Sequence, residues 1–267
     1  MVVVAVAGGT GTAGRAVVAE AVGKGFVVRS ISRRIPSDER RLAGVEYTAA
    51  DFRTGMDVVT ALTGVDALIE TLDARTGSSL KALPATTVAV LAAATRAGIT
   101  RCVLLTILNA AECSMGYYQV QAARARSYEA VGIPASVIYA TQFHDLVARL
   151  FSAGSKVGLI PAFTGVSFQP IATADVARIL LDEAVAGLLP DAAAHHSRRA
   201  GGPSVWTMNE LAEQWKAATH RRGMVTSVPL PGAFGTFLRA GKNLAPDAAV
   251  GAVEFNDWLQ ARQSLAG

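Results

Sequence analysis

Residues 1–20 read MVVVAVAGGTGTAGRAVVAE, and this stretch decides the fold class. The apolar run before the first glycine has the pattern of a strand that is buried on both faces. Glycines follow directly at Gly8, Gly11 and Gly14, and apolar residues then recur at helical spacing through Thr12–Lys24. The stretch therefore predicts a strand, a glycine-rich turn and a helix.

A turn of this kind has a definite physical use. The first glycine permits a tight turn, the second lets the backbone approach a pyrophosphate, and the third lets helix and strand pack closely. The N-terminus of the helix then offers free N–H groups to the anion. The spacing is G-x-x-G-x-x-G rather than G-x-G-x-x-G, and a glycine turn without a ligand is the alternative. The predicted cofactor-binding residues of the turn are Gly8, Thr10, Gly11, Thr12, Ala13 and Gly14.

Strands and helices alternate along the first 140 residues, which calls for a parallel sheet with right-handed crossovers. We therefore expect an α/β fold, a Rossmann-type doubly wound sheet, with a small C-terminal substrate-binding lobe at the carboxyl edge of the strands. The predicted strands are Val2–Ala7, Phe26–Ser32, Val45–Ala49, Asp66–Thr71, Arg101–Thr106 and Ala135–Ala140, and the predicted helices between them are Thr12–Lys24, Val58–Leu62, Ser78–Ala97 and Tyr117–Val131.

Beyond Thr141 the pattern is looser. We expect a dinucleotide-binding domain over residues 1–150, and the remaining sheet and helix elements with the small lobe over residues 151–267. The polar stretch Asp191–Gly202 is predicted to be a loop, and the tail from Pro229 is predicted to be irregular before its last helix. The predicted helices are Gln142–Ser152, Ala174–Ala186, Met208–Thr219 and Phe255–Gln263.

Composition narrows the class of protein. Of 267 residues, 51% are hydrophobic and 17% are charged, so the chain can bury a large core. The net charge of +4 comes from scattered basic pairs, which argues against a nucleic-acid surface. No apolar run approaches the length that crosses a bilayer, and the N-terminal run lacks the basic flank of a signal peptide. Cys102 and Cys113 have no disulfide or metal-site spacing. We expect a cytoplasmic protein that binds neither membrane nor metal.

The end of the second predicted strand indicates the form of the dinucleotide. A carboxylate there would accept from the ribose of NAD, but Ser30-Ile31-Ser32-Arg33-Arg34 contains none. Ser32 can donate a hydrogen bond, and Arg33 or Arg34 can pair with the 2′-phosphate of NADP. NADP is therefore favoured, although the arginines could simply be solvated. Asp51 and Phe52, after the third strand, are predicted to hold the adenine. Thr71, which ends the fourth strand at the same edge, is also predicted to bind the cofactor.

Several motifs together resemble one known family. They are GGTGTAGR at the start, Tyr117-Tyr118 at the beginning of a helix, ATQFHD after the sixth strand, Phe168-Gln169-Pro170-Ile171 and Ala174-Asp175-Val176-Ala177. The chain resembles the NmrA-like, atypical short-chain dehydrogenase/reductases along essentially its whole length. The resemblance implies a Rossmann fold that binds NAD(P). The group includes reductases, isomerising enzymes and non-catalytic redox sensors.

The resemblance also implies catalytic positions. Reductases of the wider superfamily use a serine, a tyrosine and a lysine four residues later. Thr106 matches the serine and Tyr117 the tyrosine, but Gln121 stands at the lysine position. Glutamine can bind the ribose but carries no charge, so the pKa of Tyr117 is expected near the ordinary value of about 10. Such a phenol can donate a proton but is a poor base, which favours reduction. The alternative is a Tyr117-Tyr118 pair that only walls a pocket.

The loop after the sixth strand is predicted to border the substrate. Its His144 could exchange a proton near neutral pH, or could be satisfied by Asp145 or a helix end. The predicted substrate-binding residues are Tyr118, Gln142, Phe143 and His144. We expect an NADPH-dependent reductase of a hydrophobic small-molecule carbonyl or enone, with a role in secondary metabolism. A non-catalytic NADP(H) sensor and a non-redox enzyme on the same scaffold are the alternatives.

Overall fold

The computed structural model of the protein describes residues 1–189, 191 and 193–264. The chain divides into two compact units that are each built from separate segments. Unit 1 comprises Met1–Thr106, Gly116–Tyr139 and Val176–Arg198. Unit 2 comprises Ile107–Met115, Ala140–Asp175 and the residues from Arg199 onward.

A seven-stranded sheet in the order β3-β2-β1-β4-β5-β6-β9 organises unit 1. β1 pairs in parallel with β2 on one side and with β4 on the other, so the order of strands reverses beside β1. Ligands of doubly wound sheets bind at such a reversal, outside the carboxyl ends of the strands. The predicted Rossmann-type fold is confirmed. The strands are β1 (Val3–Ala7), β2 (Val27–Ser32), β3 (Val45–Ala49), β4 (Ala67–Glu70), β5 (Arg101–Ile107), β6 (Ala135–Ala140) and β9 (His195–Ala200).

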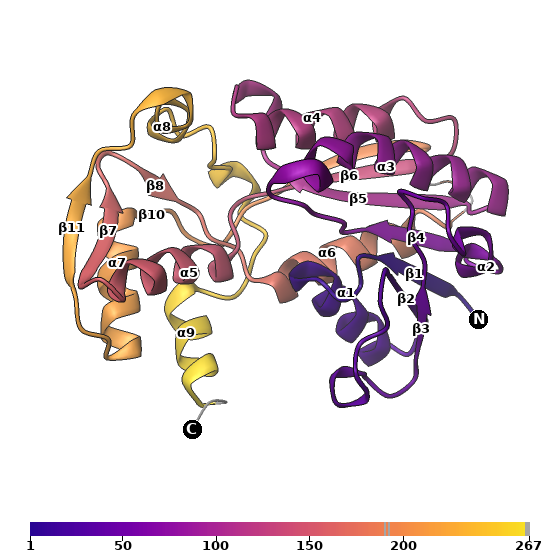
Figure 1. The fold of residues 1–267 in the computed structure, drawn as a ribbon, viewed down its shortest axis with the longest axis horizontal. Coiled ribbons are helices and arrows are strands. Elements are labelled where there is room, and N and C mark those ends of the chain that lie inside the picture. Colours follow the sequence, from indigo (N-terminus) through magenta and orange to yellow (C-terminus); the bar gives the residue numbers. More distant parts are fainter. Residues whose placement is uncertain (190, 192, 265–267) are drawn as a thin grey trace. The chain divides into compact units, whose positions relative to one another are not determined.

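Helices cover both faces of this sheet. Figure 1 shows α3 and α4 on one face and α1 and α6 on the other. The apolar side chains between these layers, among them Val90, Leu104 and Tyr128, form the core of the unit. The helices are α1 (Thr12–Gly23), α2 (Val58–Leu62), α3 (Gly77–Ala97), α4 (Gly116–Glu129) and α6 (Thr173–Ala186), with a short 3-10 turn η1 (Asp38–Arg40).

The prediction of a loop over Asp191–Gly202 was wrong for His195–Ala200, which form a strand, and residue 192 of this range lies outside the described residues. β9 (His195–Ala200) forms the edge of the sheet, where Ala135 N–H donates to Ala194 O and Thr141 N–H donates to Ala200 O. Its sequence HHSRRA is polar because most of its side chains are exposed at this edge. An edge strand needs no apolar alternation, so hydrophobic patterning cannot detect it.

Unit 2 contains short strands and helices of its own. β7 pairs in parallel with β11, and β8 pairs with β10 in antiparallel orientation. Phe151 packs on Trp215 with ring centroids 6.0 Å apart, in the core of this unit. The elements are η2 (Ala110–Glu112), α5 (His144–Ser155), β7 (Leu159–Phe163), β8 (Ser167–Phe168), β10 (Trp206–Thr207), α7 (Met208–Thr219), β11 (Met224–Val228), α8 (Gly232–Arg239), η3 (Pro246–Ala248) and α9 (Phe255–Ser264).

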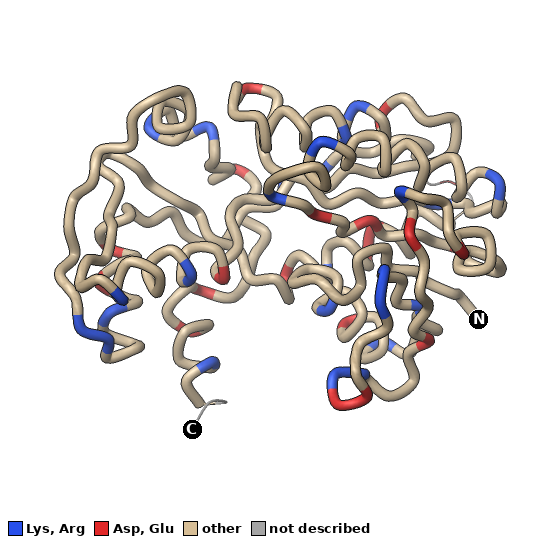
Figure 2. Tube along the Cα trace, viewed as in Figure 1, with Lys and Arg blue, Asp and Glu red and all other residues tan. Residues whose placement is uncertain are grey.

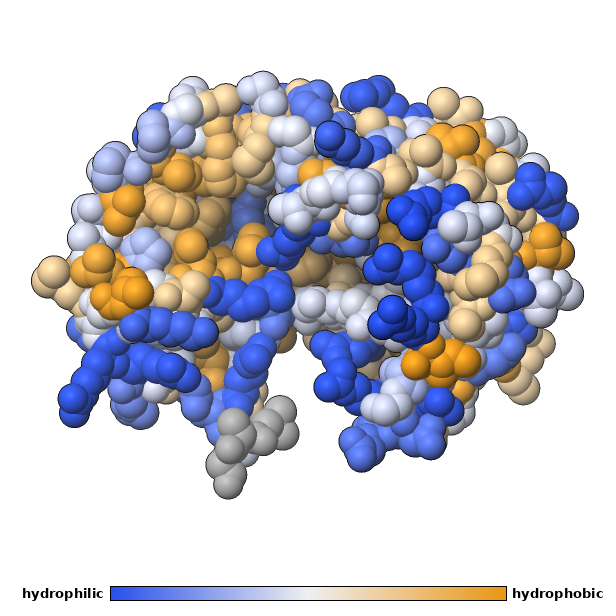
Figure 3. Space-filling view, in the orientation of Figure 1, coloured by the Kyte–Doolittle hydropathy of each residue, from blue (hydrophilic) through white to orange (hydrophobic). Residues whose placement is uncertain are grey.

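Two expectations about unit 2 need correction. The four short strands were not predicted, since two-residue and five-residue segments hold too few positions to establish a period. The tail beyond Pro229 was predicted to be irregular before its last helix, but α8 lies there. The apolar residues Leu159 and Met224, which are paired in register at the start of β7 and β11, remain exposed. Apolar side chains are visible on this part of the surface in Figure 3.

The expectation about membrane spans also needs correction. Among the described residues, α3 is one helix that is long and apolar enough to cross a bilayer, judged by length and composition only. The sequence reading missed it because alanine supplies most of its apolar character. In this fold Val90, Leu91 and Ala94 of α3 are buried in the core of unit 1. Basic and acidic residues are dispersed along the chain in both units (Figure 2).

Candidate cofactor and catalytic site

The glycine turn joins β1 to α1 where the strand order reverses. Gly8 has a positive φ of 84°, and its N–H donates to Ile31 O at 2.9 Å. A Cβ at Gly14 would lie 2.2 Å from Gly8 O, and a Cβ at Gly9 would lie 2.3 Å from Ser30 Oγ. Glycine at these positions is therefore required by close packing of the turn, as the sequence predicted for Gly14.

The N-terminus of α1 has the properties of an anion site. Its N-cap is Gly11, which makes no side-chain capping hydrogen bond, and the first turn holds no acidic residue. A Cβ at Gly11 would meet only Gly8 O within 4 Å, at 3.2 Å, so its outer side is open. The first N–H groups of the helix thus lack a side-chain partner and carry the positive end of the helix dipole. This geometry fits the pyrophosphate of a dinucleotide.

The end of β2 presents two free guanidinium groups. Arg33 and Arg34 are exposed, and within the described part of the chain neither one forms an ion pair. Ser32 Oγ donates to Arg34 O at 2.7 Å, which holds the turn that carries them. Asp51 and Phe52 follow β3 at the same edge of the sheet. Asp51 Oδ1 accepts from Arg53 N–H at 2.9 Å, and the Phe52 ring is buried.

Thr71 follows β4, beside the glycine turn. Its hydroxyl donates to Ala7 O at 3.0 Å, and Gly8 packs against its carbonyl, so Thr71 holds β4 to the end of β1. Two residues later stands Asp73, which the sequence reading did not select. A carboxylate at the carboxyl end of a central strand was the signal that could have found it.

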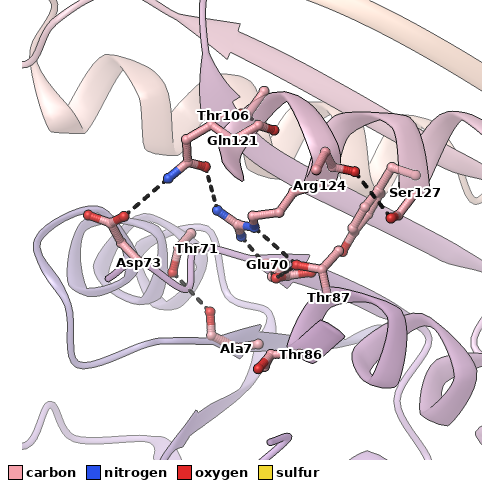
Figure 4. A network of polar contacts seen from close by, with 12 residues as sticks. Ala7, Glu70, Thr71, Asp73, Thr86, Thr87, Thr106, Gln121, Arg124 and Ser127 are labelled. Carbon is pink, nitrogen blue, oxygen red and sulfur yellow. Dashed lines mark hydrogen bonds and ion pairs between the residues drawn. The ribbon is translucent and has the colours of Figure 1, made fainter. Parts of the chain in front are cut away.

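A chain of polar contacts starts at Asp73 and runs into the interior of unit 1 (Figure 4). Asp73 Oδ1 accepts from Tyr117 Oη at 3.0 Å and from Gln121 Nε2 at 3.2 Å. Gln121 Oε1 accepts from Arg124 at 2.7 Å, and Arg124 in turn donates to Glu70 at 2.9 Å. The side chains of Arg124 and Glu70 are 1% and 0% exposed, so they form a buried ion pair.

The buried ion pair was also missed by the sequence reading. Glu70 ends the apolar run of β4 and also accepts from Thr87 at 2.7 Å and Tyr128 at 2.9 Å. With these donors its charge is compensated inside the unit. A carboxylate at the end of an otherwise apolar strand was the available signal, but its partner Arg124 lies 54 residues away in the sequence.

The expectation of an ordinary pKa for Tyr117 was wrong. Burial raises the pKa of the Tyr117 hydroxyl well above 10, and the charge of Asp73 and its hydrogen bond raise this pKa further. Arg75, whose Nε lies 3.8 Å from Asp73 Oδ2, lowers the pKa of Tyr117 by less. At neutral pH the hydroxyl is therefore fully protonated, so it can donate a proton and cannot accept one.

The other predicted residues of this unit lie on β5 and α4. Thr106 is buried near the end of β5, and its hydroxyl donates to the backbone carbonyl of Gln121 at 3.3 Å. Tyr118 is 5% exposed, and its ring meets Tyr117 edge to face at 6.0 Å. The structure thus gathers the glycine turn, Ser32, both arginines, Asp51, Phe52, Thr71, Thr106, Tyr117 and Gln121 within unit 1.

Gln142, Phe143 and His144 belong to unit 2. His144 is fully buried, and its Nε2 lies 2.9 Å from Val253 O. Burial lowers the pKa of the imidazole, although the contact with Val253 opposes the shift, so His144 is neutral at pH 7. Gln142 is largely buried and accepts from Asn243 at 3.4 Å, while Phe143 caps α5. The fold thus pairs Nε2 of His144, while its Nδ1 is buried without a hydrogen-bond partner among the described residues, and the role of His144 stays a prediction.

Within the described residues, no three His, Cys, Asp or Glu side chains form a group that could hold a metal ion. Cys102 and Cys113 are both buried, and they form no disulfide with each other.

The parallel sheet, the uncapped helix N-terminus and the glycine turn define a dinucleotide-binding protein of Rossmann type. The family described as NAD(P)H-binding matches residues 8–184, about two thirds of the chain. The protein therefore belongs to this NAD(P)H-binding family, as the resemblance to the NAD(P)-binding, NmrA-like short-chain dehydrogenase/reductases predicted. No curated protein matches the sequence.

Solved structures agree on the fold. The NADPH-dependent quinone oxidoreductase of Escherichia coli, solved with NADPH, is 17% identical with a TM-score of 0.77 over 97% of this chain and 99% of that one. A nucleoside-diphosphate-sugar epimerase of Staphylococcus aureus is 17% identical with a TM-score of 0.70 over 97% and 100%. The UDP-N-acetylglucosamine 4-epimerase of Bacillus cereus is 14% identical with a TM-score of 0.70 over 99% and 97%. At these identities the likeness concerns the fold.

Proposed function

We propose that the protein is an NADPH-dependent reductase of a hydrophobic small-molecule carbonyl or enone, with Tyr117 as the proton donor. The observation that carries this proposal is the Tyr117 hydroxyl, which donates to Asp73 Oδ1 at 3.0 Å in the same unit as the glycine turn. Residues 1–150 would form the cofactor domain, and residues 151–267 would supply the remaining sheet and helix elements and the small C-terminal lobe that binds the substrate. A cytoplasmic location and a role in secondary metabolism stay predictions.

The residues at the carboxyl edge of the sheet fit NADPH. The free N–H groups of α1 would hold the pyrophosphate, and Arg33 and Arg34 would hold the 2′-phosphate as charge-assisted donors. Asp51 and Phe52 would border the adenine. When bound, NADPH supplies a hydride to the electrophilic carbon of the substrate.

Tyr117 would then deliver the proton that balances the reaction. Its Oη releases Asp73 and gives its proton to the substrate oxygen, which gains the electron pair of the carbonyl bond as the carbon takes up hydride. The resulting phenolate recovers a proton from water. Thr106 would orient the substrate oxygen. Its hydroxyl would release the long hydrogen bond to the backbone carbonyl of Gln121 and donate to the substrate oxygen instead. Gln121 would bind the ribose through its amide without adding charge.

The substrate class is suggested by chemistry and by one neighbour. A carbonyl or enone needs one hydride and one proton, which this set of residues could supply. Quinones belong to the same class of conjugated carbonyl compounds, and the E. coli neighbour is named as a quinone oxidoreductase. Quinones and enones are therefore the first compounds to test.

The test is NADPH consumption in the presence of quinones and enones, followed by absorbance and by identification of the reduced product. We expect Tyr117→Phe to lower kcat/KM by about 100-fold or more, because positioned acid catalysis contributes about 10²–10⁴-fold. Tyr139→Phe is the matched control, since its hydroxyl contacts Glu129. Unchanged turnover in a folded Tyr117→Phe protein would remove Tyr117 from the role of donor.

A second candidate is a sensor of the NADPH/NADP⁺ ratio without turnover. The contact of Tyr117 with Asp73 and the glutamine in place of lysine favour it, since both depart from the usual catalytic set. Calorimetric titration with each form of the cofactor separates the two functions. A sensor distinguishes the oxidised from the reduced form and consumes no NADPH with any substrate. Product formed at constant NADPH absorbance would indicate non-redox chemistry instead.

A further inference from the structure

Asp73 is the carboxylate to which the Tyr117 hydroxyl donates, and the proposed reaction assigns it no role beyond that contact. Its Oδ1 accepts two donors at once, Tyr117 Oη at 3.0 Å and Gln121 Nε2 at 3.2 Å. Its side chain is 42% exposed, so the carboxylate sits at the open edge of unit 1 and not in the core.

The contact of the Gln121 amide oxygen with Arg124 fixes the orientation of the Gln121 amide toward Asp73. A guanidinium group has only donors, so Arg124 can approach Gln121 only at the amide oxygen. That contact is 2.7 Å long, and Arg124 is held in place by Glu70 at 2.9 Å and Thr87 at 3.0 Å. The NH₂ group of Gln121 must therefore face Asp73, as Figure 4 shows. The buried ion pair thus orders the two donors that converge on Asp73.

We propose that Asp73 is the positioning residue of this site: it gathers the Tyr117 hydroxyl and the Gln121 amide on one carboxylate oxygen and thereby confines Tyr117 to the role of proton donor. Its meaning for catalysis rests on the proposed reductase function. A negative charge 3.0 Å from Oη opposes formation of phenolate, whereas a lysine at position 121 would favour it. The charge beside the tyrosine of this site is therefore negative, whereas the lysine of the usual tyrosine–lysine pair is positive.

The other groups that face Tyr117 leave this effect in place. Arg75, from the same loop as Asp73, and the hydrogen bond of Gln121 on α4 both lower the pKa of Tyr117, but each does so by less than Asp73 raises it. Reduction needs the protonated phenol, so its rate should stay independent of pH far into the alkaline range. Oxidation of an alcohol needs the phenolate, so its rate should rise only at high pH.

Asp73→Asn tests the proposal, because asparagine keeps an acceptor oxygen and loses the charge. Ionisation of Tyr117 is followed by phenolate absorbance, as the difference between each protein and its Tyr117→Phe counterpart. We expect Tyr117 to ionise at a pH about one unit or more lower in the variant. Asp57→Asn is the control: Asp57 is exposed with φ 56°, a conformation that asparagine tolerates, and it should cause no shift.

The second readout is the pH profile of NADPH-dependent reduction. In Asp73→Asn the alkaline fall in rate should occur at a lower pH, and this shift should equal the shift of the phenolate titration. An unchanged titration in Asp73→Asn, and likewise in Asp73→Ser should the first variant not fold, would overturn the proposal. A shifted titration without any NADPH turnover would instead uphold the link between Asp73 and Tyr117 and reject the reductase function.

Discussion

At position 121 a neutral side chain stands between two opposite charges. Arg124 binds the oxygen of the Gln121 amide, and Asp73 binds its nitrogen. A lysine there would place its ammonium beside the Arg124 guanidinium, which the interior of the unit could not screen. A neutral glutamine therefore suits both charged neighbours. The buried Arg124 beside position 121 is the physical reason for a glutamine in place of the usual lysine.

The proposed preference for NADP also depends on single residues. We predict that replacing both Arg33 and Arg34 by alanine weakens NADPH binding about 10- to 100-fold, since hydrogen bonds to charged groups contribute about 1.5–3 kcal/mol. Binding of NADH should change little, because NADH lacks the 2′-phosphate. Calorimetric titration of both cofactors measures the difference. Arg40→Ala serves as the control, and an equal loss for both cofactors would refute the assignment.

At the scale of elements, the turn between β1 and α1 depends on close packing that leaves no room for a side chain. We predict that Gly14→Ala destabilises the protein by about 1–3 kcal/mol and lowers NADPH affinity at least tenfold, because its Cβ would lie 2.2 Å from Gly8 O. The measurements are the free energy of unfolding in urea and cofactor titration.

Gly23→Ala is the matched control in the same helix. Nothing lies within 4 Å of a Cβ at Gly23, so this change should stabilise the protein by about 0.4–1 kcal/mol and leave NADPH affinity unchanged. If both variants bound NADPH as tightly as the native protein, the glycine turn would not be the pyrophosphate site.

At the scale of the whole molecule, a polar cluster ties separate segments of unit 1 together. Glu183 on α6 accepts from the buried Arg101 of β5 at 3.0 Å, from Ser136 of β6 at 2.7 Å and from His196 of β9 at 2.9 Å. Burial opposes the charge of Glu183, but its hydrogen bonds with Ser136 and His196 and the contact with Arg101 outweigh burial and lower the pKa below 4.5.

The lowered pKa of Glu183 predicts a pH dependence of stability. A carboxyl whose pKa is depressed by folding contributes stability above its unfolded value, and this contribution is lost as pH falls through the folded pKa. We predict that Glu183→Gln lowers the free energy of unfolding by about 3 kcal/mol at pH 7, because it leaves Arg101 without its ionic partner. The difference from the native protein should shrink below about pH 4.5. Thermal unfolding from pH 7 to 3 tests it, with Glu39→Gln as control; a constant difference would contradict it.

The sequence by itself determined the order of strands β1–β6 with the helices between them, the glycine turn and the class of cofactor. These features depend on residues that are adjacent in the chain, such as the apolar run that ends at Gly8. Tertiary structure alone decided the rest. Tyr117 meets Asp73 across 44 residues and Arg124 meets Glu70 across 54, while β9 is a strand only because the β6 edge pairs with it. Hydrogen bonds and charges act through space, so side chains distant in sequence set the chemistry of Tyr117.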